Sequence, residues 1–132
     1  MPSVLITGAS RGIGHAAAKA FAAAGWDLLL VSRSEAALQS LSAELSTSGS
    51  RVAYRAIDLT DSEAIAPGLN ELLGQGLRPS VLINNAGAAY TGDLLAMPLD
   101  RWEWLMQLNL TSVFQVCAAV VPAMRPAGGL VI

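Results

Sequence analysis

The stretch that decides the fold lies near the amino terminus and reads Val4-Leu5-Ile6-Thr7-Gly8-Ala9-Ser10-Arg11-Gly12-Ile13-Gly14. An apolar run, a glycine-rich turn and the Ala-rich segment Gly12 to Ala24 are typical of a strand, a loop and a helix. The glycines let the backbone approach a ligand closely, and the first turn of the helix offers unpaired N–H groups to a phosphate. The spacing G-x-x-x-G-x-G is not that of a Walker A loop, because no lysine follows Ile13. A purely structural glycine turn is the alternative.

Strand-like and helix-like segments alternate along the rest of the chain. Strands are predicted at Val4–Ile6, Asp27–Val31, Arg51–Ile57, Ser80–Ile83 and Gly129–Ile132. The continuous apolar run Asp27–Val31 is typical of a strand buried on both faces. Helices are predicted over Gly12–Ala24, over Ser34–Leu45 and over Leu99 to about Met124. A further helix is predicted to begin at a capping box formed by Thr60 and Glu63, with a kink or an early end at Pro67-Gly68. This alternation predicts a single α/β domain over residues 1–132 with right-handed βαβ units and a parallel sheet. Ligands bind such sheets beyond the carboxyl ends of the strands.

Length and composition exclude several classes of protein. The 132 residues amount to one domain, and a hydrophobic share of 53% with 14% charged residues is too apolar for a disordered chain. A net charge of −2 gives no basic field for nucleic acid. One Cys and one His supply neither a disulfide nor a metal cluster. We expect a small-molecule partner, no metal and, without a secretory signal, a cytoplasmic localisation.

One uncharged stretch, Trp104 to Met124, is long enough to cross a bilayer. Polar side chains interrupt it at Gln107, Asn109, Thr111, Ser112 and Gln115, and a proline at Pro122. We therefore interpret it as a helix packed against a sheet and expect no membrane partner.

The end of the second strand carries Ser32 and Arg33, roughly 20 residues past the glycine loop, where dinucleotide-binding sheets read the adenosine ribose. An acidic residue there would accept the ribose hydroxyls, whereas arginine suits a phosphate dianion. Arg11 in the glycine loop could approach the same group. The pattern favours a 2′-phosphate, and so NADP over NAD. The alternative is a solvated Arg33 and a Ser32 that caps the next helix with Glu35.

Polar residues also follow the third and fourth strands. Asp58 could accept a hydrogen bond from the adenine amino group while Leu59 covers a ring face, although an Asp that only forms a turn would look identical. Asn84-Asn85-Ala86-Gly87 places paired amides where they could bond across the sheet and hold it open against a ribose. A plain Asn-rich turn is the alternative there.

These motifs together resemble the short-chain dehydrogenase/reductase family in its subgroup of ordinary length. The resemblance rests on TGASRGIG, SR, DL, NNAG and Asn109, which occur in order over the whole chain. It implies a Rossmann-type doubly wound sheet of strand order 3-2-1-4-5 and hydride transfer between a nicotinamide dinucleotide and an alcohol or carbonyl substrate. It assigns the phosphates to Gly8, Ser10, Arg11, Gly12, Ile13 and Gly14, the 2′-phosphate to Ser32 and Arg33, the adenine to Asp58 and Leu59, and the ribose side to Asn84, Ala86 and Gly87.

The catalytic residues of that family are only partly present. Its members use a Tyr as general acid, a Lys four residues later that lowers the Tyr pKa, a Ser, and a helix Asn that anchors a proton-relay water. Here Tyr54 is followed four residues on by Asp58, Tyr90 by Leu94, and the only lysine is Lys19. Only Asn109 fits the pattern, and a helix-to-sheet hydrogen bond is its alternative role.

Two functions follow from this mixture. The first is the amino-terminal part of an NADP-dependent oxidoreductase, incomplete at its carboxyl end and truncated before the catalytic helix, because residues 128–132 stop inside an apolar strand. The second is a non-catalytic dinucleotide-binding module or sensor. We expect a homo-oligomer when the protein is complete, and no activity from these residues alone.

Overall fold

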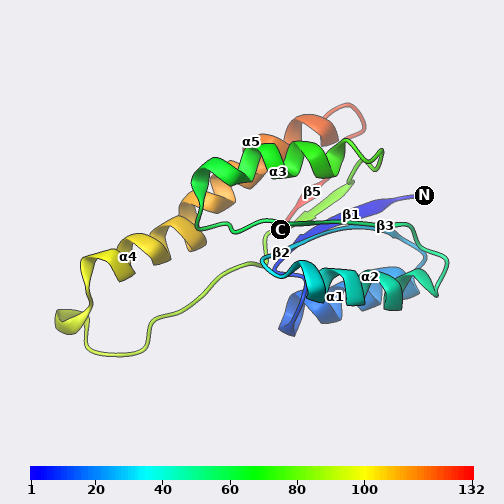
Figure 1. The fold of residues 1–132 in the computed structure, drawn as a ribbon. Coiled ribbons are helices and arrows are strands. Elements are labelled where there is room, and N and C mark those ends of the chain that lie inside the picture. Colours follow the sequence, from blue (N-terminus) through cyan, green and yellow to red (C-terminus); the bar gives the residue numbers. More distant parts are fainter.

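The computed structural model describes all 132 residues and contains one five-stranded parallel sheet (Figure 1). Its strands are β1 (Ser3–Thr7), β2 (Asp27–Ser32), β3 (Val52–Ala56), β4 (Val81–Ile83) and β5 (Leu130–Val131). They lie in the order β3-β2-β1-β4-β5, so the predicted doubly wound sheet and its strand order are confirmed. The order reverses between β1 and β4, which is the place where such sheets bind ligands.

Helices cover both faces of the sheet, as the predicted crossovers require (Figure 1). One face carries α1 (Gly12–Ala23) and α2 (Glu35–Ser46), and the other carries α3 (Ser62–Leu73) and α5 (Ser112–Met124). A 3-10 turn, η1 (Leu94–Ala96), precedes α4 (Leu99–Met106), and the π-helical turn η2 (Gln107–Thr111) joins α4 to α5. Figure 1 shows α4 extending away from the sheet while α5 packs on it beside α3.

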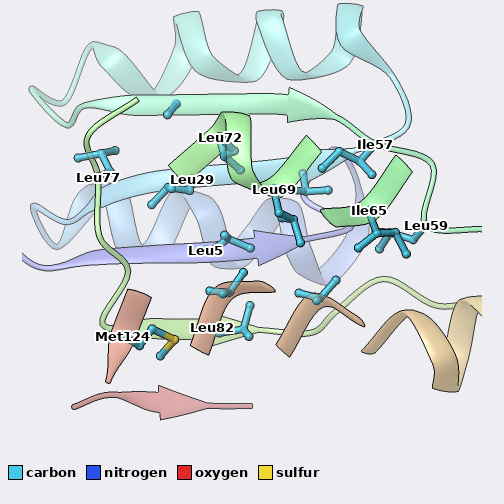
Figure 2. Close-up of a cluster of buried hydrophobic side chains, with 14 residues drawn as sticks. Leu5, Leu29, Ile57, Leu59, Ile65, Leu69, Leu72, Leu77, Leu82 and Met124 are labelled. Carbon is cyan, nitrogen blue, oxygen red and sulfur yellow. The ribbon is translucent and has the colours of Figure 1, made fainter. Parts of the chain in front are cut away.

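The two central strands are buried on both faces, which explains their unbroken apolar sequence. Leu5, Leu29 and Leu82 point toward α3 and α5 within a cluster of 14 buried residues (Figure 2). Val4 and Ile6 point the other way, toward the Ala-rich face of α1. The core therefore fixes the register of β1 against its neighbours and the position of the loop that follows β1.

The start and the middle of α3 differ from the prediction. Its N-cap is Asp61, whose side chain accepts from the Glu63 N–H at 3.2 Å, so the proposed capping box of Thr60 and Glu63 is wrong. The early end expected at Pro67-Gly68 is also wrong, because α3 continues to Leu73 with Pro67 inside it. Ile65, Leu69 and Leu72 are fully buried on this helix. Burial of such side chains stabilises by about 1.5–3 kcal/mol each, which offsets the cost of about 3 kcal/mol for an internal proline.

The predicted single helix from Leu99 to Met124 is interrupted by the π turn η2. The whole stretch of 26 residues is long and apolar enough to cross a membrane by length and composition, and an 18-residue segment of it has a mean hydropathy of 1.5. Its polar side chains Gln107, Asn109, Ser112 and Gln115 all form hydrogen bonds within the domain. Our interpretation as a helix packed against the sheet fits these contacts.

Candidate functional site

A pocket of about 830 Å³ lies beyond the carboxyl ends of the strands and draws its walls from loops far apart in the sequence. Nine of the predicted site residues line it: Gly8, Ser10, Arg11, Gly12, Ser32, Arg33, Leu59, Ala86 and Gly87. Ile13, Gly14, Asp58, Asn84 and Asn109 do not line it. The remaining walls come from Val31, Ser34, Ala37, Ile57, Thr60, Asn85, Ala88, Trp104 and Leu108.

The amino terminus of α1 is built to accept an anion. Its N-cap, Arg11, makes no side-chain capping bond, and no acidic residue occupies the first turn. The first N–H groups of a helix have no partner within the helix, so here they stay available beside the lining residues Ser10 and Gly12. The next two residues are Ile13, which is 81% exposed, and Gly14, which is buried beneath the loop. Neither has a polar side chain that could bond these N–H groups in place of an anion.

Gly14 lets α1 pack directly on the glycine loop. A Cβ on this residue would lie 2.2 Å from the carbonyl oxygen of Gly8 and 2.5 Å from Asn85 Nδ2. No side chain can be accommodated at these distances. The glycine spacing therefore sets how closely the helix terminus approaches the pocket.

Thr7 and Asn85 hold the glycine loop against the loop that follows β4; a bond across the sheet was predicted for Asn85 but not for Thr7. Asn85 Nδ2 donates to the carbonyls of Thr7 at 3.2 Å and Gly8 at 3.1 Å. The Thr7 hydroxyl accepts from the backbone N–H groups of Asn85 and Ala86, both at 3.0 Å. A buried threonine at the end of a central strand was the signal in the sequence that could have revealed this link.

Both asparagines bond across the sheet, but in opposite directions: Asn85 bonds toward the end of β1, and Asn84 toward the end of β5. Asn84 points elsewhere, and its Nδ2 donates to Cys117 Sγ at 3.7 Å and to the carbonyl of Ile132 at 3.4 Å. The two amides thus reach the strands on either side of β4, because side chains of successive residues in an extended segment point to opposite sides. The ribose role of Asn84 stays a prediction.

The end of β2 presents two serines and one arginine to the pocket. Ser34, not Ser32, is the N-cap of α2, and its side chain accepts from the Ala37 N–H at 3.1 Å. The alternative in which Ser32 caps the helix is therefore excluded. Ser32 Oγ accepts from the Ser34 N–H at 3.3 Å, and the exposed Arg33 lines the same pocket as Arg11 from the glycine loop.

Asp58 forms the turn that we named as its alternative role. One carboxylate oxygen, Oδ1, accepts from the Thr60 hydroxyl at 2.6 Å and from the Thr60 N–H at 2.9 Å. These bonds to Thr60, with a smaller contribution from the Arg33 charge, lower the pKa of Asp58 below its ordinary value. The carboxylate is thus ionised at neutral pH and sits next to the pocket rather than in its wall.

Asn109 belongs to η2 and pairs with the backbone of the loop after β4. Its Nδ2 donates to the Ala88 carbonyl at 2.7 Å, and its Oδ1 accepts from the Ala88 N–H at 3.0 Å. A Cβ on Gly87 would come within 2.9 Å of Asn109 Oδ1. The amide therefore fixes the backbone of two pocket residues, which is the helix-to-sheet link that we named as its alternative role.

The other residues with catalytic side chains lie outside the pocket wall. Lys19 forms an ion pair of 2.6 Å with Glu44 between α1 and α2. Tyr54 is on the edge strand β3, and Tyr90 does not line the pocket. None of the lining residues carries a group that exchanges a proton near neutral pH.

Comparison with known proteins fits this geometry. The family model described as short chain dehydrogenase matches residues 2–132. The chain belongs to this short-chain dehydrogenase family. Sulfoacetaldehyde reductase 2 from Chromohalobacter salexigens is 37% identical over 126 residues, which are 95% of this chain and 50% of that protein. The chain spans about half the length of the curated relatives it matches.

Solved structures of the short-chain dehydrogenase family superimpose closely on the chain. One is an alcohol dehydrogenase from Thermococcus sibiricus in complex with 5-hydroxy-NADP, with a TM-score of 0.95, 31% identity and coverage of 99% of this chain and 56% of that one. Another is a short-chain dehydrogenase from Sphingobium yanoikuyae in complex with NADPH, with a TM-score of 0.89, 38% identity and coverage of 99% and 52%. The family thus accounts for the sheet, the glycine loop and the pocket of this chain.

Proposed function

We propose that this chain is the cofactor-binding part of an NADP-dependent oxidoreductase that transfers hydride between NADP(H) and a small alcohol or carbonyl substrate. The nicotinamide would supply the hydride. The chain's own residues bind and orient: the uncapped terminus of α1 accepts the pyrophosphate, and the loop fixed by Asn85 and Asn109 holds the ribose side. Two relatives solved with NADP-type ligands support the cofactor class.

One observation carries the preference for NADP over NAD. Arg11 and Arg33 come from two different loops and line the same pocket next to Ser32. No carboxylate lies in the pocket wall to accept the ribose hydroxyls of NAD. Two guanidinium groups suit a 2′-phosphate, since charged hydrogen bonds to a dianion are among the strong ones.

Titration of NADPH and NADH against the wild type and Arg33→Asp tests this preference. We expect the wild type to bind NADPH more tightly, and the substitution to weaken NADPH by more than about tenfold, because such a bond contributes ~1.5–3 kcal/mol. Arg78→Asp, at an exposed residue before β4 that does not line the pocket, changes the net charge equally and serves as control. Equal binding of both cofactors by the wild type, or an unchanged preference in Arg33→Asp, overturns the assignment.

The role of Asn109 in this proposal is to position groups for proton transfer in the full-length enzyme. The residues that donate the proton are absent from these 132 residues, which contain no Tyr-x-x-x-Lys. A non-catalytic dinucleotide-binding module or sensor is the second candidate, and the lack of a proton donor in the pocket wall favours it for the chain as it stands.

We also propose that the full-length protein is a cytoplasmic homo-oligomer. Large apolar side chains lie exposed along the stretch from α4 to α5, namely Leu99, Trp102, Leu110 and Phe114. Exposed large apolar side chains gathered on one helical stretch are typical of a surface that another copy of the protein covers. Analytical ultracentrifugation of the full-length protein measures the state directly, and a monomer at micromolar concentration contradicts the proposal.

A further inference from the structure

Trp104 is a pocket residue that neither the cofactor motifs nor Asn109 account for. It lies near the end of α4, and it is the only tryptophan that lines the pocket. Leu108, one helical turn further on, lines the same pocket and packs against the core cluster that contains Ile57 and Leu59. Trp104 and Leu108 therefore form one wall, and Ile57 and Leu59 form the wall next to it.

Two glutamines tie this helical wall to the loop after β3. Gln107 Nε2 donates to the Leu59 carbonyl at 3.2 Å and to Gln115 Oε1 at 2.9 Å. Gln115 Nε2 in turn donates to the Ser62 carbonyl at 3.2 Å. The helix and the loop Leu59–Ser62 are thus linked at both ends, so the separation between the two walls is fixed.

The π turn η2 makes this link possible. An α-helix rotates by about 100° per residue, so residues eight apart point about 80° away from each other. The wider π turn absorbs one residue, and Gln107 and Gln115 then behave like residues seven apart on one face. The interruption of the helix therefore serves to place Gln107, Leu108 and Trp104 toward the pocket side.

The Arg101 guanidinium restricts the motion of the Trp104 ring. Arg101 Cζ lies 4.3 Å from the centre of the Trp104 ring, one turn earlier on α4. A cation stacked on one face of an indole holds the ring and leaves its remaining surface for another flat group. Arg101 itself does not line the pocket, so its part is to position Trp104.

We propose that Trp104 is a wall of the adenine subsite and that it contributes stacking affinity for the base of the cofactor. The inference rests on the proposed NADP binding and on the adenine contact expected of Leu59, which lines the same pocket as Arg33 and Trp104. A planar purine fits between an aliphatic side chain and an indole, and aromatic stacking with bases is a general source of affinity.

The test measures the affinities of three probes for the chain: NADPH, adenosine 2′,5′-bisphosphate and reduced nicotinamide mononucleotide. Trp104→Ala should weaken NADPH and the bisphosphate by the same factor, about tenfold, and leave the mononucleotide unchanged because it has no adenine. Trp104→Phe should retain most of the affinity. Trp102→Ala is the matched control, because Trp102 is also on α4 and 48% exposed but does not line the pocket.

A fluorescence measurement keeps the proposal falsifiable if Trp104→Ala does not fold. In Trp26→Phe/Trp102→Phe the emission comes from Trp104 alone, and adenosine 2′,5′-bisphosphate should quench it in a saturable way. Binding of the bisphosphate without quenching, or equal loss for all three probes in Trp104→Ala, overturns the role of Trp104 while NADP binding stands. If the wild type binds neither NADPH nor the bisphosphate, the proposed function itself fails.

Discussion

Thr7→Val removes a hydroxyl that joins β1 to the loop after β4. This hydroxyl accepts two N–H bonds of 3.0 Å, from Asn85 and Ala86, and Thr7 is 2% exposed. Asn85 N–H keeps a second acceptor, the Ile83 carbonyl at 3.1 Å, whereas Ala86 N–H makes its only hydrogen bond to Thr7. The substitution therefore leaves one N–H without a partner and weakens the bonding of another.

The expected loss of stability follows from these two groups. An unsatisfied buried N–H costs about 1–3 kcal/mol. Ala86 is only half-buried and lines the pocket, so water replaces part of the lost bond and the lower half of that range applies. With the weakened Asn85 bond added, we expect the free energy of unfolding to fall by about 2 kcal/mol, roughly 30-fold in the folding equilibrium.

Urea unfolding of the wild type, Thr7→Val and Thr7→Ser measures this loss. Serine keeps the hydroxyl and loses one methyl group, which costs about 0.8 kcal/mol. We expect Thr7→Ser to lie between the wild type and Thr7→Val. A Thr7→Val protein as stable as Thr7→Ser would refute the reasoning, because the hydrogen bonds of the hydroxyl would then contribute nothing to the free energy of unfolding.

Three further predictions follow from the site. In the full-length enzyme, Asn109→Ala should lower kcat well before it weakens cofactor binding, and an unchanged kcat with a lower Tm would leave Asn109 a purely structural role. Thr60→Val should raise the pKa of Asp58 toward its ordinary value in an NMR titration, with Thr60→Ser as control; because the Asp58 pKa is lowered on folding, its contribution to stability is present at neutral pH and is lost as the pH falls through that lowered pKa. The 132 residues alone should oxidise no NADPH with a panel of ketones, since no lining residue supplies a proton; sustained oxidation that is lost in Asn109→Ala would contradict this.

Much of the fold could be predicted because local and global patterns agree. Apolar runs at Asp27–Val31 and Ser80–Ile83 are typical of strands, the first of them buried on both faces, and the glycine loop marks where the first crossover begins. Arg33 was found because its distance from the loop is set by one βαβ unit. Features of this kind depend on neighbours in the sequence.

Features that depend on distant contacts could not be predicted. Pro67 stays inside α3 because residues from β3 and α5 pack on that helix, which no local signal reports. The π turn η2 and the wall formed by Trp104 depend on how α5 sits on the sheet. The choice between Asn84 and Asn85 depends on which side of the strand end faces Gly8. In each case tertiary packing decided between local alternatives.

The most direct test of the central claim is a crystal structure of the protein grown with NADPH. The account predicts the pyrophosphate at the first turn of α1, the 2′-phosphate between Arg11 and Arg33, and the adenine between Leu59 and Trp104. A cofactor bound outside this pocket, or bound within it with the 2′-phosphate away from both arginines, would contradict the account.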